Sequence, residues 1–367
     1  MSELSAHRVI VTGGAGFIGC ALSERLAGAV GKWVVIDSLH PQVHEVQERP
    51  AALHEAAELV VGDVTDPAVW DAVLADVQPT VVIHLAAETG TAQSLDEATR
   101  HAHVNVVGTT VMLDALGRHG IVPERFLLSS SRAVYGEGAW EREGGEVFYP
   151  GQRSHAQFEA GQWDFAGARP LPSTAALTVP KPTSVYGATK LAQENILAAW
   201  VNARDTALTV LRLQNVYGPG QSLVNSYTGI VSLFSQLARR GESIPIYEDG
   251  AITRDFVYID DVADAFVAAL AEQPCTETGA RAGVGVGAGT PTFDVGSGVG
   301  TTILQLAEAI AAYYSAPAPH ITGRYRDGDV RHAECRIDAT LGALEWEPRW
   351  PLDRGVAGLQ EWIGSQL

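Results

Sequence analysis

The sequence has few cysteines, and their arrangement does not suggest a disulfide or metal scaffold. Its 367 residues include Cys20, Cys275 and Cys335, which lie far apart and form no CxxC pair. An odd number of isolated cysteines argues against a disulfide framework and against a zinc site, and it favours a reducing compartment. We therefore predict a protein without a bound metal.

Positive charge is also scarce. The chain has 25 Lys and Arg residues against 43 Asp and Glu residues, and its formal net charge is −18. This balance argues against nucleic acid and against an anionic membrane surface as partners, because both are polyanions. Lysine occurs only as Lys32, Lys181 and Lys190, so a lysine inside a chemical motif is informative.

Long hydrophobic runs are absent as well. No stretch approaches the roughly 18 apolar residues that cross a bilayer, and the N-terminal residues lack the basic and apolar regions of a secretory signal. Hydrophobic residues make up 46% of the chain, which is enough for a sizeable core. We expect a cytoplasmic protein.

The first two hundred residues alternate short apolar runs with longer amphipathic segments. Such alternation is typical of βαβ units and predicts an α/β fold with a parallel sheet and helices on both faces. The predicted strands are Arg8–Thr12, Trp33–Asp37, Ala57–Val61, Thr80–Leu85, Arg125–Ser129 and Thr209–Leu213. The predicted helices are Phe17–Ala27, Asp66–Ala75, Val104–His119 and Ser184–Asn202.

The regular alternation fades after Tyr217, where Gly218-Pro219-Gly220 interrupts the chain. We predict a domain over residues 1–217 and a smaller C-terminal α/β domain over residues 218–367 that binds substrate. Within the latter, residues 278–290 are predicted to form a glycine-rich loop, residues 291–295 a strand and residues 301–314 a helix.

Residues 138–182 interrupt the first domain with many aromatic residues and little periodicity. A segment this long without a pattern is usually functional or an added subdomain. Two interpretations stay open: a surface excursion with its own small core, and a segment that contributes to substrate binding or to a dimer.

The strand at residues 8–12 is followed by a glycine-rich turn and a helix. Gly13, Gly16 and Gly19 allow a tight turn, close approach of a pyrophosphate and close helix packing, and the helix N-terminus offers free N–H donors. Asp37 ends the next strand, 18 residues after Gly19 (37 − 19). A carboxylate there binds the ribose hydroxyls and favours NAD over NADP. The context predicts a Rossmann-type, doubly wound sheet that binds NAD, although Asp37 could instead start a turn.

Asp63 follows the third predicted strand, where the fold places the adenine. Its carboxylate is expected to accept a hydrogen bond from the adenine amine. Taken alone, Asp63 fits a helix cap equally well.

Tyr186 and Lys190 are four residues apart on a predicted helix, so their side chains are neighbours. A phenol with a pKa near 10 is a weak base at neutral pH, and an adjacent ammonium is expected to lower that pKa. Ser131, at the end of a strand, can hydrogen-bond the reacting oxygen. YxxxK pairs are common by chance on solvated helices, but the glycine turn and the serine run favour a catalytic group.

Several motifs occur together in one order, and through them the chain resembles the extended short-chain dehydrogenase/reductases and, within them, the nucleotide-sugar epimerases. The motifs are Gly13–Gly19, His84–Ala87, Ser129–Ser131, Tyr186–Lys190, Arg212–Pro219 and Arg254–Phe256. The resemblance covers nearly the whole length. It implies catalysis by Ser131, Tyr186 and Lys190, and a homodimer formed by residues 104–119 and 184–202. It also implies cofactor contacts from Phe17, Ile18, Val64, Leu85, Ala86, Ala87, Asn105, Ser129, Tyr186 and Lys190.

The resemblance further implies a nucleotide-diphosphate sugar as substrate. Asn215 matches a residue that hydrogen-bonds the diphosphate, and Tyr247 belongs to a segment that packs on the base. Guanidinium groups suit phosphate oxygens, so Arg254, Arg326 and Arg331 are candidate clamps, with surface ion pairs as the alternative. Thr89, Ser131 and the stretch 226–230 are further candidates at the sugar-nucleotide site.

The residues after Ser131 bear on the reaction type. Related 4,6-dehydratases place an Asp-Glu pair there to eliminate water, whereas this chain has Arg132 and Ala133. The resemblance therefore implies a 4-epimerase that oxidises C4 and returns hydride to the opposite face. The amino-acid sequence of residues 214–223 is similar to that of epimerases that act on dTDP-6-deoxyhexoses such as dTDP-L-rhamnose. A UDP-hexose epimerase, a NAD(P)H-dependent ketosugar reductase and a non-catalytic scaffold are the alternatives.

Overall fold

A computed structural model describes residues 3–223, 229–272, 290–326 and 328–366. Its centre is a sheet of seven parallel strands in the order β13-β9-β5-β4-β1-β2-β3. This confirms the predicted Rossmann-type sheet. The strands are β1 (Arg8–Thr12), β2 (Lys32–Asp37), β3 (Glu58–Val61), β4 (Val81–His84), β5 (Arg125–Ser131), β9 (Ala207–Leu213) and β13 (Thr292–Val295).

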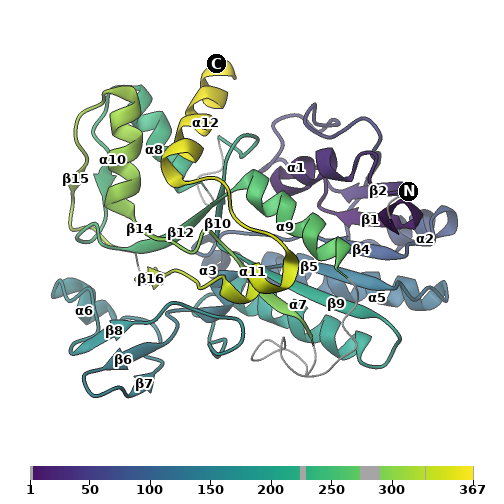
Figure 1. Ribbon diagram of the computed structural model, residues 1–367, viewed down its shortest axis with the longest axis horizontal. Helices are drawn as coiled ribbons and strands as arrows, with labels where there is room; N and C mark the ends of the chain where they lie inside the picture. Colours follow the sequence, from purple (N-terminus) through teal and green to yellow (C-terminus); the bar gives the residue numbers. More distant parts are fainter. Residues whose placement is uncertain (1–2, 224–228, 273–289, 327, 367) are drawn as a thin grey trace.

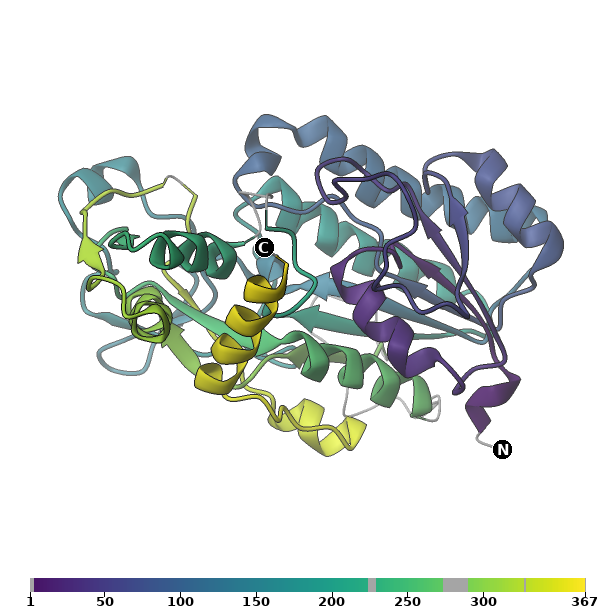
Figure 2. The same cartoon turned by 90° about the horizontal axis from the view of Figure 1, so that it is seen from above.

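Helices cover both faces of this sheet (Figures 1 and 2). One face packs against α1 (Phe17–Leu26), α9 (Ile259–Ala271) and α11 (Asp338–Leu344). The other packs against α2 (Pro67–Asp76), α5 (Gly108–Arg118) and α7 (Val185–Val201). Except for the partly exposed edge strand β3, the strands are buried on both faces, which is why they are largely continuous apolar runs rather than alternating ones.

The predicted helix 104–119 is divided. A π-helical turn, η2 (His103–Val107), precedes α5, and the short helices α3 (Gln93–Asp96) and α4 (Ala98–Ala102) come before it. A 3-10 turn, η1 (Glu3–Ala6), opens the described chain. Another, η3 (Arg132–Tyr135), follows β5 directly.

A second layered part lies beside the sheet and carries α8, α10 and α12 (Figure 1). Its apolar side chains form a separate core. Its helices are α8 (Ile230–Arg239), α10 (Ile303–Tyr314) and α12 (Leu352–Ser365). Its strands are β10 (Asn215–Tyr217), β11 (Pro245–Ile246), β12 (Thr253–Tyr258), β14 (Gly300–Thr302), β15 (His320–Ile321) and β16 (His332–Ala333). The chain after residue 218 thus builds this part, but it also returns α9, β13 and α11 to the large sheet.

Residues 138–182 form a small excursion of their own at the lower left of Figure 1. The antiparallel strands β6 (Trp140–Arg142), β7 (Val147–Phe148) and β8 (Ala168–Pro170) lie there with the short helix α6 (His155–Glu159). Trp140 packs edge-on against Phe165, with ring centroids 4.9 Å apart. The segment therefore has its own aromatic core.

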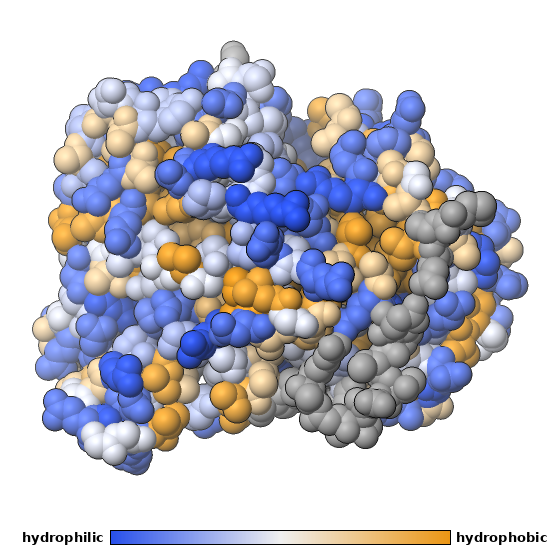
Figure 3. All heavy atoms as spheres, viewed as in Figure 1, coloured by the Kyte–Doolittle hydropathy of each residue, from blue (hydrophilic) through white to orange (hydrophobic). Residues whose placement is uncertain are grey.

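On the face shown in Figure 3, hydrophilic residues surround several separate hydrophobic groups. None of the described helices combines the length and the apolarity that a bilayer crossing requires. In the described ranges, no three His, Cys, Asp or Glu side chains are grouped as a metal site. The predicted glycine-rich loop at 278–290 lies outside the described residues except for Thr290, and Cys275 lies outside them as well.

Candidate functional site

The turn between β1 and α1 depends on its glycines for close packing. Gly13 has a φ of +66°, and a Cβ on it would lie 2.7 Å from the backbone nitrogen of Ala86. A Cβ on Gly19 would lie 2.3 Å from the Cα of Gly14. Gly16 caps α1 without a side-chain hydrogen bond, so the first N–H groups of the helix stay available to an anion.

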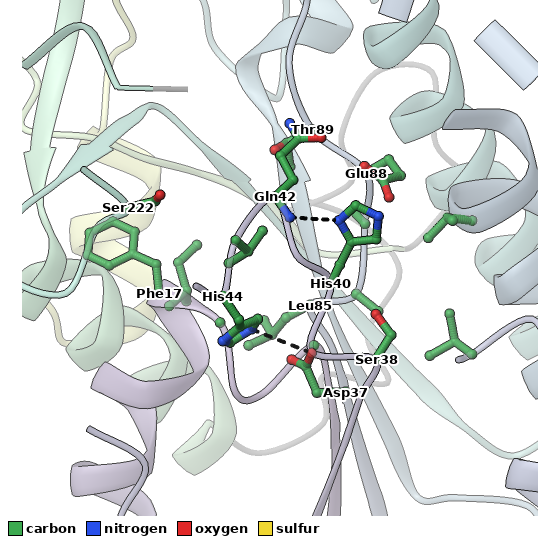
Figure 4. A pocket seen from close by; sticks show the side chains of 18 of the residues that line it. Phe17, Asp37, Ser38, His40, Gln42, His44, Leu85, Glu88, Thr89 and Ser222 are labelled. Carbon is green, nitrogen blue, oxygen red and sulfur yellow. Dashed lines mark hydrogen bonds and ion pairs between the residues drawn. The ribbon is translucent and has the colours of Figure 1, made fainter. Parts of the chain in front are cut away.

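A cavity of about 370 Å³ opens in front of this turn. Residues from the ends of four neighbouring strands converge on it, as expected where a parallel sheet binds its ligand. Part of the lining is shown in Figure 4. The predicted residues that line it are Gly13, Gly16, Phe17, Ile18, Asp37, Asp63, Val64, Leu85, Ala86, Ala87 and Thr89. Thr89, expected at the sugar, is therefore placed by the structure at the boundary of this first cavity.

Asp37 is held at the cavity wall by the backbone. Its carboxylate accepts hydrogen bonds from the N–H groups of Ala15 (3.0 Å) and Leu39 (2.9 Å). His44 also lies near, with Nε2 3.8 Å from Oδ1 (Figure 4). Because a carboxylate has about four acceptor positions, two remain for ribose hydroxyls.

Asp63 does not cap the next helix. Its Oδ1 accepts from the N–H and the hydroxyl of Thr65, both at 2.8 Å, while Asp66 caps α2. Asp63 therefore forms a tight turn at the cavity wall.

Two residues predicted to contact the cofactor are placed behind the cavity. Asn105 is fully buried, and its amide donates to the Glu88 carbonyl (3.0 Å) and the Thr189 hydroxyl (2.9 Å) while accepting from the Glu88 N–H (2.7 Å). Its hydrogen bonds thus hold the 88–89 turn against α7. Ser129 contributes its carbonyl oxygen, which accepts from Lys190.

The segment after β2 adds residues that motif reasoning missed. His40, Gln42 and His44 project into the first cavity (Figure 4). Arg100 also lines it and pairs with Glu88 at 2.7 Å. No sequence signal marks these residues: His40, Gln42 and His44 lie in the loop between β2 and β3, and Arg100 lies in the short helix α4, without a recognisable motif.

A second cavity of about 280 Å³ adjoins the first. Gly229 lines both, and the successive residues Asn215 and Val216 line one each. The polar residues around the second cavity include Arg132, Thr183, Ser184, Asn215, Tyr247, Arg254, Arg326 and Asp329. Of the predicted stretch 226–230, residues 226–228 lie outside the described residues, and Gly229 and Ile230 line this cavity.

Adjacent strands bring the predicted diphosphate residues together. β10 pairs in parallel with β12, with Asn215 opposite Phe256, and both Asn215 and Arg254 line the second cavity. Oδ1 of Asn215 is buried without a hydrogen-bond partner. Burial lowers the pKa of Arg254 from its usual value, and Asp329, 3.7 Å away, opposes this shift. Arg326 lies over the ring of Tyr247, 5.0 Å from its centroid.

Arg331, the third predicted clamp, is not among the residues that line this cavity. Its guanidinium donates to Asp164 (2.8 Å), Glu248 (3.0 Å) and Asp249 (2.7 Å). Glu248 also accepts from Arg153 at 2.8 Å. These contacts occupy Arg331 in tying residues 138–182 to the C-terminal part, which corrects its predicted position at the diphosphate.

The structure brings Ser131, Tyr186 and Lys190 together at the carboxyl end of β5 and the start of α7. Ser184 begins α7 by accepting from the N–H of Gly187 at 3.0 Å. Tyr186 and Ser131 share a hydrogen bond between their side chains. Nζ of Lys190 donates to the Ser129 carbonyl at 2.9 Å, and burial lowers the pKa of Lys190 to about 7.

The phenol of Tyr186 has a second positive group near it besides the predicted Lys190. Burial raises the pKa of Tyr186, and the Ser131 hydroxyl and the Arg132 guanidinium oppose this rise. The amine of Lys190 donates to the Ser129 carbonyl, and its predicted effect on the phenol stays a prediction.

A buried polar network lies beside this group. Glu194, one turn beyond Lys190, accepts from Nε (3.0 Å) and an Nη (2.7 Å) of Arg212 and from the Ser130 hydroxyl. Bidentate geometry makes this pairing rigid. It fixes α7 against β5 and β9 at the turn that carries Lys190.

Comparison with known proteins gives concordant findings. The model of the NAD dependent epimerase/dehydratase family matches residues 9–280. The dTDP-L-rhamnose 4-epimerase of Burkholderia thailandensis is 60% identical over 366 residues, covering 100% of this chain and 97% of that protein. The UDP-glucose 4-epimerase of Mycolicibacterium smegmatis is 31% identical, covering 98% and 99%. The crystal structure of UDP-glucose 4-epimerase with UDP-glucose from Thermotoga maritima has a TM-score of 0.75 at 27% identity, covering 98% and 99%.

Proposed function

This chain belongs to the NAD dependent epimerase/dehydratase family, and we propose that it is a nucleotide-sugar 4-epimerase whose substrate is dTDP-L-rhamnose. The observation that carries the proposal is the 60% identity, over the whole chain, with the dTDP-L-rhamnose 4-epimerase of Burkholderia thailandensis. The UDP-glucose 4-epimerase of Mycolicibacterium smegmatis is only 31% identical over a similar span.

The first cavity fits NAD. The free N–H groups at the start of α1 suit the pyrophosphate, and the glycines of the preceding turn place no side chain between it and the backbone. The carboxylate of Asp37 suits a ribose without a 2′-phosphate. When bound, the nicotinamide supplies the acceptor and later the donor of hydride at C4. We assign Leu85, Ala86 and Ala87 to the wall beside it.

The residues of the catalytic group have separate roles in this proposal. Tyr186 takes the proton of the C4 hydroxyl, and Ser131, hydrogen-bonded to it, holds the same oxygen and relays the proton. Lys190, one helical turn after Tyr186 on α7, would hold the nicotinamide ribose. Proton transfer by a positioned side chain typically increases the rate by roughly 10²–10⁴-fold.

The second cavity is assigned to the diphosphate and the sugar. Asn215, Arg254 and Arg326 would hold the phosphates, and Tyr247 would pack on the base. The positions after Ser131 hold Arg132 and Ala133 rather than carboxylates. Glu137, the nearest downstream acid in sequence, accepts hydrogen bonds from the backbone N–H of Arg331. This arrangement favours epimerisation over elimination of water.

We also propose a cytoplasmic homodimer, with residues 1–217 mainly holding NAD and 218–367 mainly holding the sugar nucleotide. Dimerisation through η2, α5 and α7 is supported by apolar side chains that remain accessible there: Val107 is 40% exposed, and Val111 and Trp200 are partly exposed. The free thiols Cys20 and Cys335 suit a reducing compartment.

The decisive experiment is incubation of the purified holoprotein with dTDP- and UDP-hexoses without added cofactor, with products identified by NMR. We expect dTDP-L-rhamnose to be converted into its C4 epimer, dTDP-6-deoxy-L-talose, with no net change in NAD. Conversion of a UDP-hexose alone would refute the substrate. Turnover that requires added NAD(P)H in stoichiometric amounts would indicate a reductase.

A further inference from the structure

Arg132 occupies an unusual place between β5 and α7. It begins the turn η3 directly after Ser131, and η3 packs against the start of α7. The packing is close: a Cβ on Gly187 would lie 2.4 Å from the carbonyl oxygen of Ala133. The backbone of Arg132 is thereby fixed beside Tyr186.

The guanidinium of Arg132 lacks the close carboxylate partner that three other internal arginines have. Arg153, Arg212 and Arg331 each donate to a carboxylate at 2.7–2.8 Å. For Arg132, no hydrogen bond or ion pair is found within the part of the chain that the structure describes. Burial and the nearby Arg254 lower its pKa to about 9, although Asp329 and Glu137 oppose this shift. The side chain of Arg132 is partly exposed and lines a cavity, so a ligand bound there can reach its N–H donors.

The cavity shows where that ligand would lie. Arg132 lines the second cavity together with Asn215, Arg254 and Arg326. Arg132 also lies close enough to Tyr186 for the two side chains to interact electrostatically. In the proposed function, on which this inference rests, Tyr186 meets C4 of the hexose and Arg254 meets the diphosphate. The part of a nucleotide sugar between those two points is the hexose ring.

We propose that Arg132 is a further catalytic residue, whose guanidinium binds the hexose beside its reacting carbon and stabilises negative charge on the oxygen of Tyr186. Three groups around that phenol define the arrangement: Ser131 from β5 hydrogen-bonds it, Arg132 from η3 supplies positive charge, and Lys190 from α7 directs its amine to the Ser129 carbonyl. Three further charged residues, Arg254, Asp329 and Glu137, act electrostatically on the guanidinium of Arg132.

The charge on Arg132 has a consequence for catalysis. Positive charge close to a phenol favours the phenolate. If the same guanidinium also binds the hexose, it orients the sugar relative to Tyr186. Hydrogen bonds to charged groups carry roughly 10- to 100-fold in binding or rate. The effect appears in the pH dependence of the rate, because Tyr186 can accept the proton of the C4 hydroxyl only while its own phenol is deprotonated.

The test compares Arg132→Met, Arg132→Lys and a control, Arg240→Met, in the NAD-loaded protein. Arg240 is exposed and pairs only locally with Glu242. The measurements are kcat and KM for dTDP-L-rhamnose across pH, and the affinity for dTDP, which lacks the hexose. NAD content and thermal unfolding of each variant establish that the fold is kept.

For Arg132→Met we expect kcat/KM to fall about 10- to 100-fold while dTDP affinity stays within about twofold of the wild type. The acidic limb of its kcat profile should move to higher pH, and Arg132→Lys should restore part of that movement. Loss of dTDP affinity as large as the loss of kcat/KM would overturn the proposal by placing Arg132 at a phosphate. Unchanged kcat/KM and pH profile would also overturn it. If the wild type converts a different nucleotide sugar, the proposed substrate fails by itself, and the same variants are compared on the sugar that is converted.

Discussion

Replacing Arg331 by Met should destabilise the protein while leaving nucleotide binding nearly intact. Arg331 pairs with Asp164, Glu248 and Asp249. Asp164 and Asp249 are open to solvent, with side chains 60% and 39% exposed, so each of these pairs contributes only about 0–1 kcal/mol. Glu248 is buried, and the main cost arises there.

The magnitude follows from what remains around Glu248. Breaking a buried ion pair costs about 3–5 kcal/mol. Glu248 keeps Arg153, which donates to it at 2.8 Å, so we expect the lower end of that range, a loss of about 3 kcal/mol in the free energy of unfolding. Glu248 also has a φ of +53°, an unfavourable backbone conformation that its surroundings must hold.

The assay pairs urea unfolding with titration by dTDP, and the matched variant is Arg326→Met. Arg326 lines the second cavity and lies over Tyr247, so its removal should weaken dTDP binding about 10- to 100-fold. It should change stability by no more than about 0.5 kcal/mol. If Arg331→Met keeps wild-type stability but loses dTDP binding, Arg331 is a diphosphate ligand and the reasoning from its ion pairs is wrong.

Three further substitutions test the other parts of the site. Tyr186→Phe should reduce turnover by about 10²–10⁴-fold while bound NAD is retained; unchanged activity would mean that another group is the base. Asp37→Arg should weaken NAD binding and raise the relative affinity for NADP, as measured by cofactor titration of the apoprotein; an unchanged preference would reject its ribose contact. Gly19→Ala should abolish NAD binding, because the added Cβ would lie 2.3 Å from Gly14, whereas Gly342→Ala in α11, with no atom within 4 Å of the added Cβ, should bind NAD normally; equal NAD content in both would contradict the close packing.

The sequence predicts the sheet well because its central strands are buried on both faces and read as apolar runs. The glycines of the first turn are also recognisable, because a side chain at Gly13 or Gly19 would clash with the neighbouring backbone. Residues 8–12 form β1 as expected, and Asp37 ends β2 at the first cavity. The predicted strand at 291–295 also exists, but its partner is β9 in the large sheet. Pairing over such a distance along the chain depends on tertiary packing, which local patterns do not encode.

Sequence patterns predict the partners of charged side chains less well than they predict the role of glycines. The fork of Arg331 suits a phosphate and a carboxylate equally, so only the positions of Asp164, Glu248 and Asp249 distinguish a clamp from an ion pair. The spacing of Tyr186 and Lys190 predicts neighbouring side chains, but the direction of the amine toward Ser129 depends on the carbonyls of β5. Both outcomes depend on groups that are remote in sequence.

The position of β13 at the border of the large sheet matters during synthesis of the chain. β9 has been made by residue 213, yet the strand that covers its outer edge starts only at Thr292. Until then β9 presents unpaired backbone groups, which readily template association with other chains. Ribosomes that stall between residues 213 and 292 would therefore release fragments that are prone to aggregate. The nascent chain can pair the outer edge of β9 only after most of it has been synthesised.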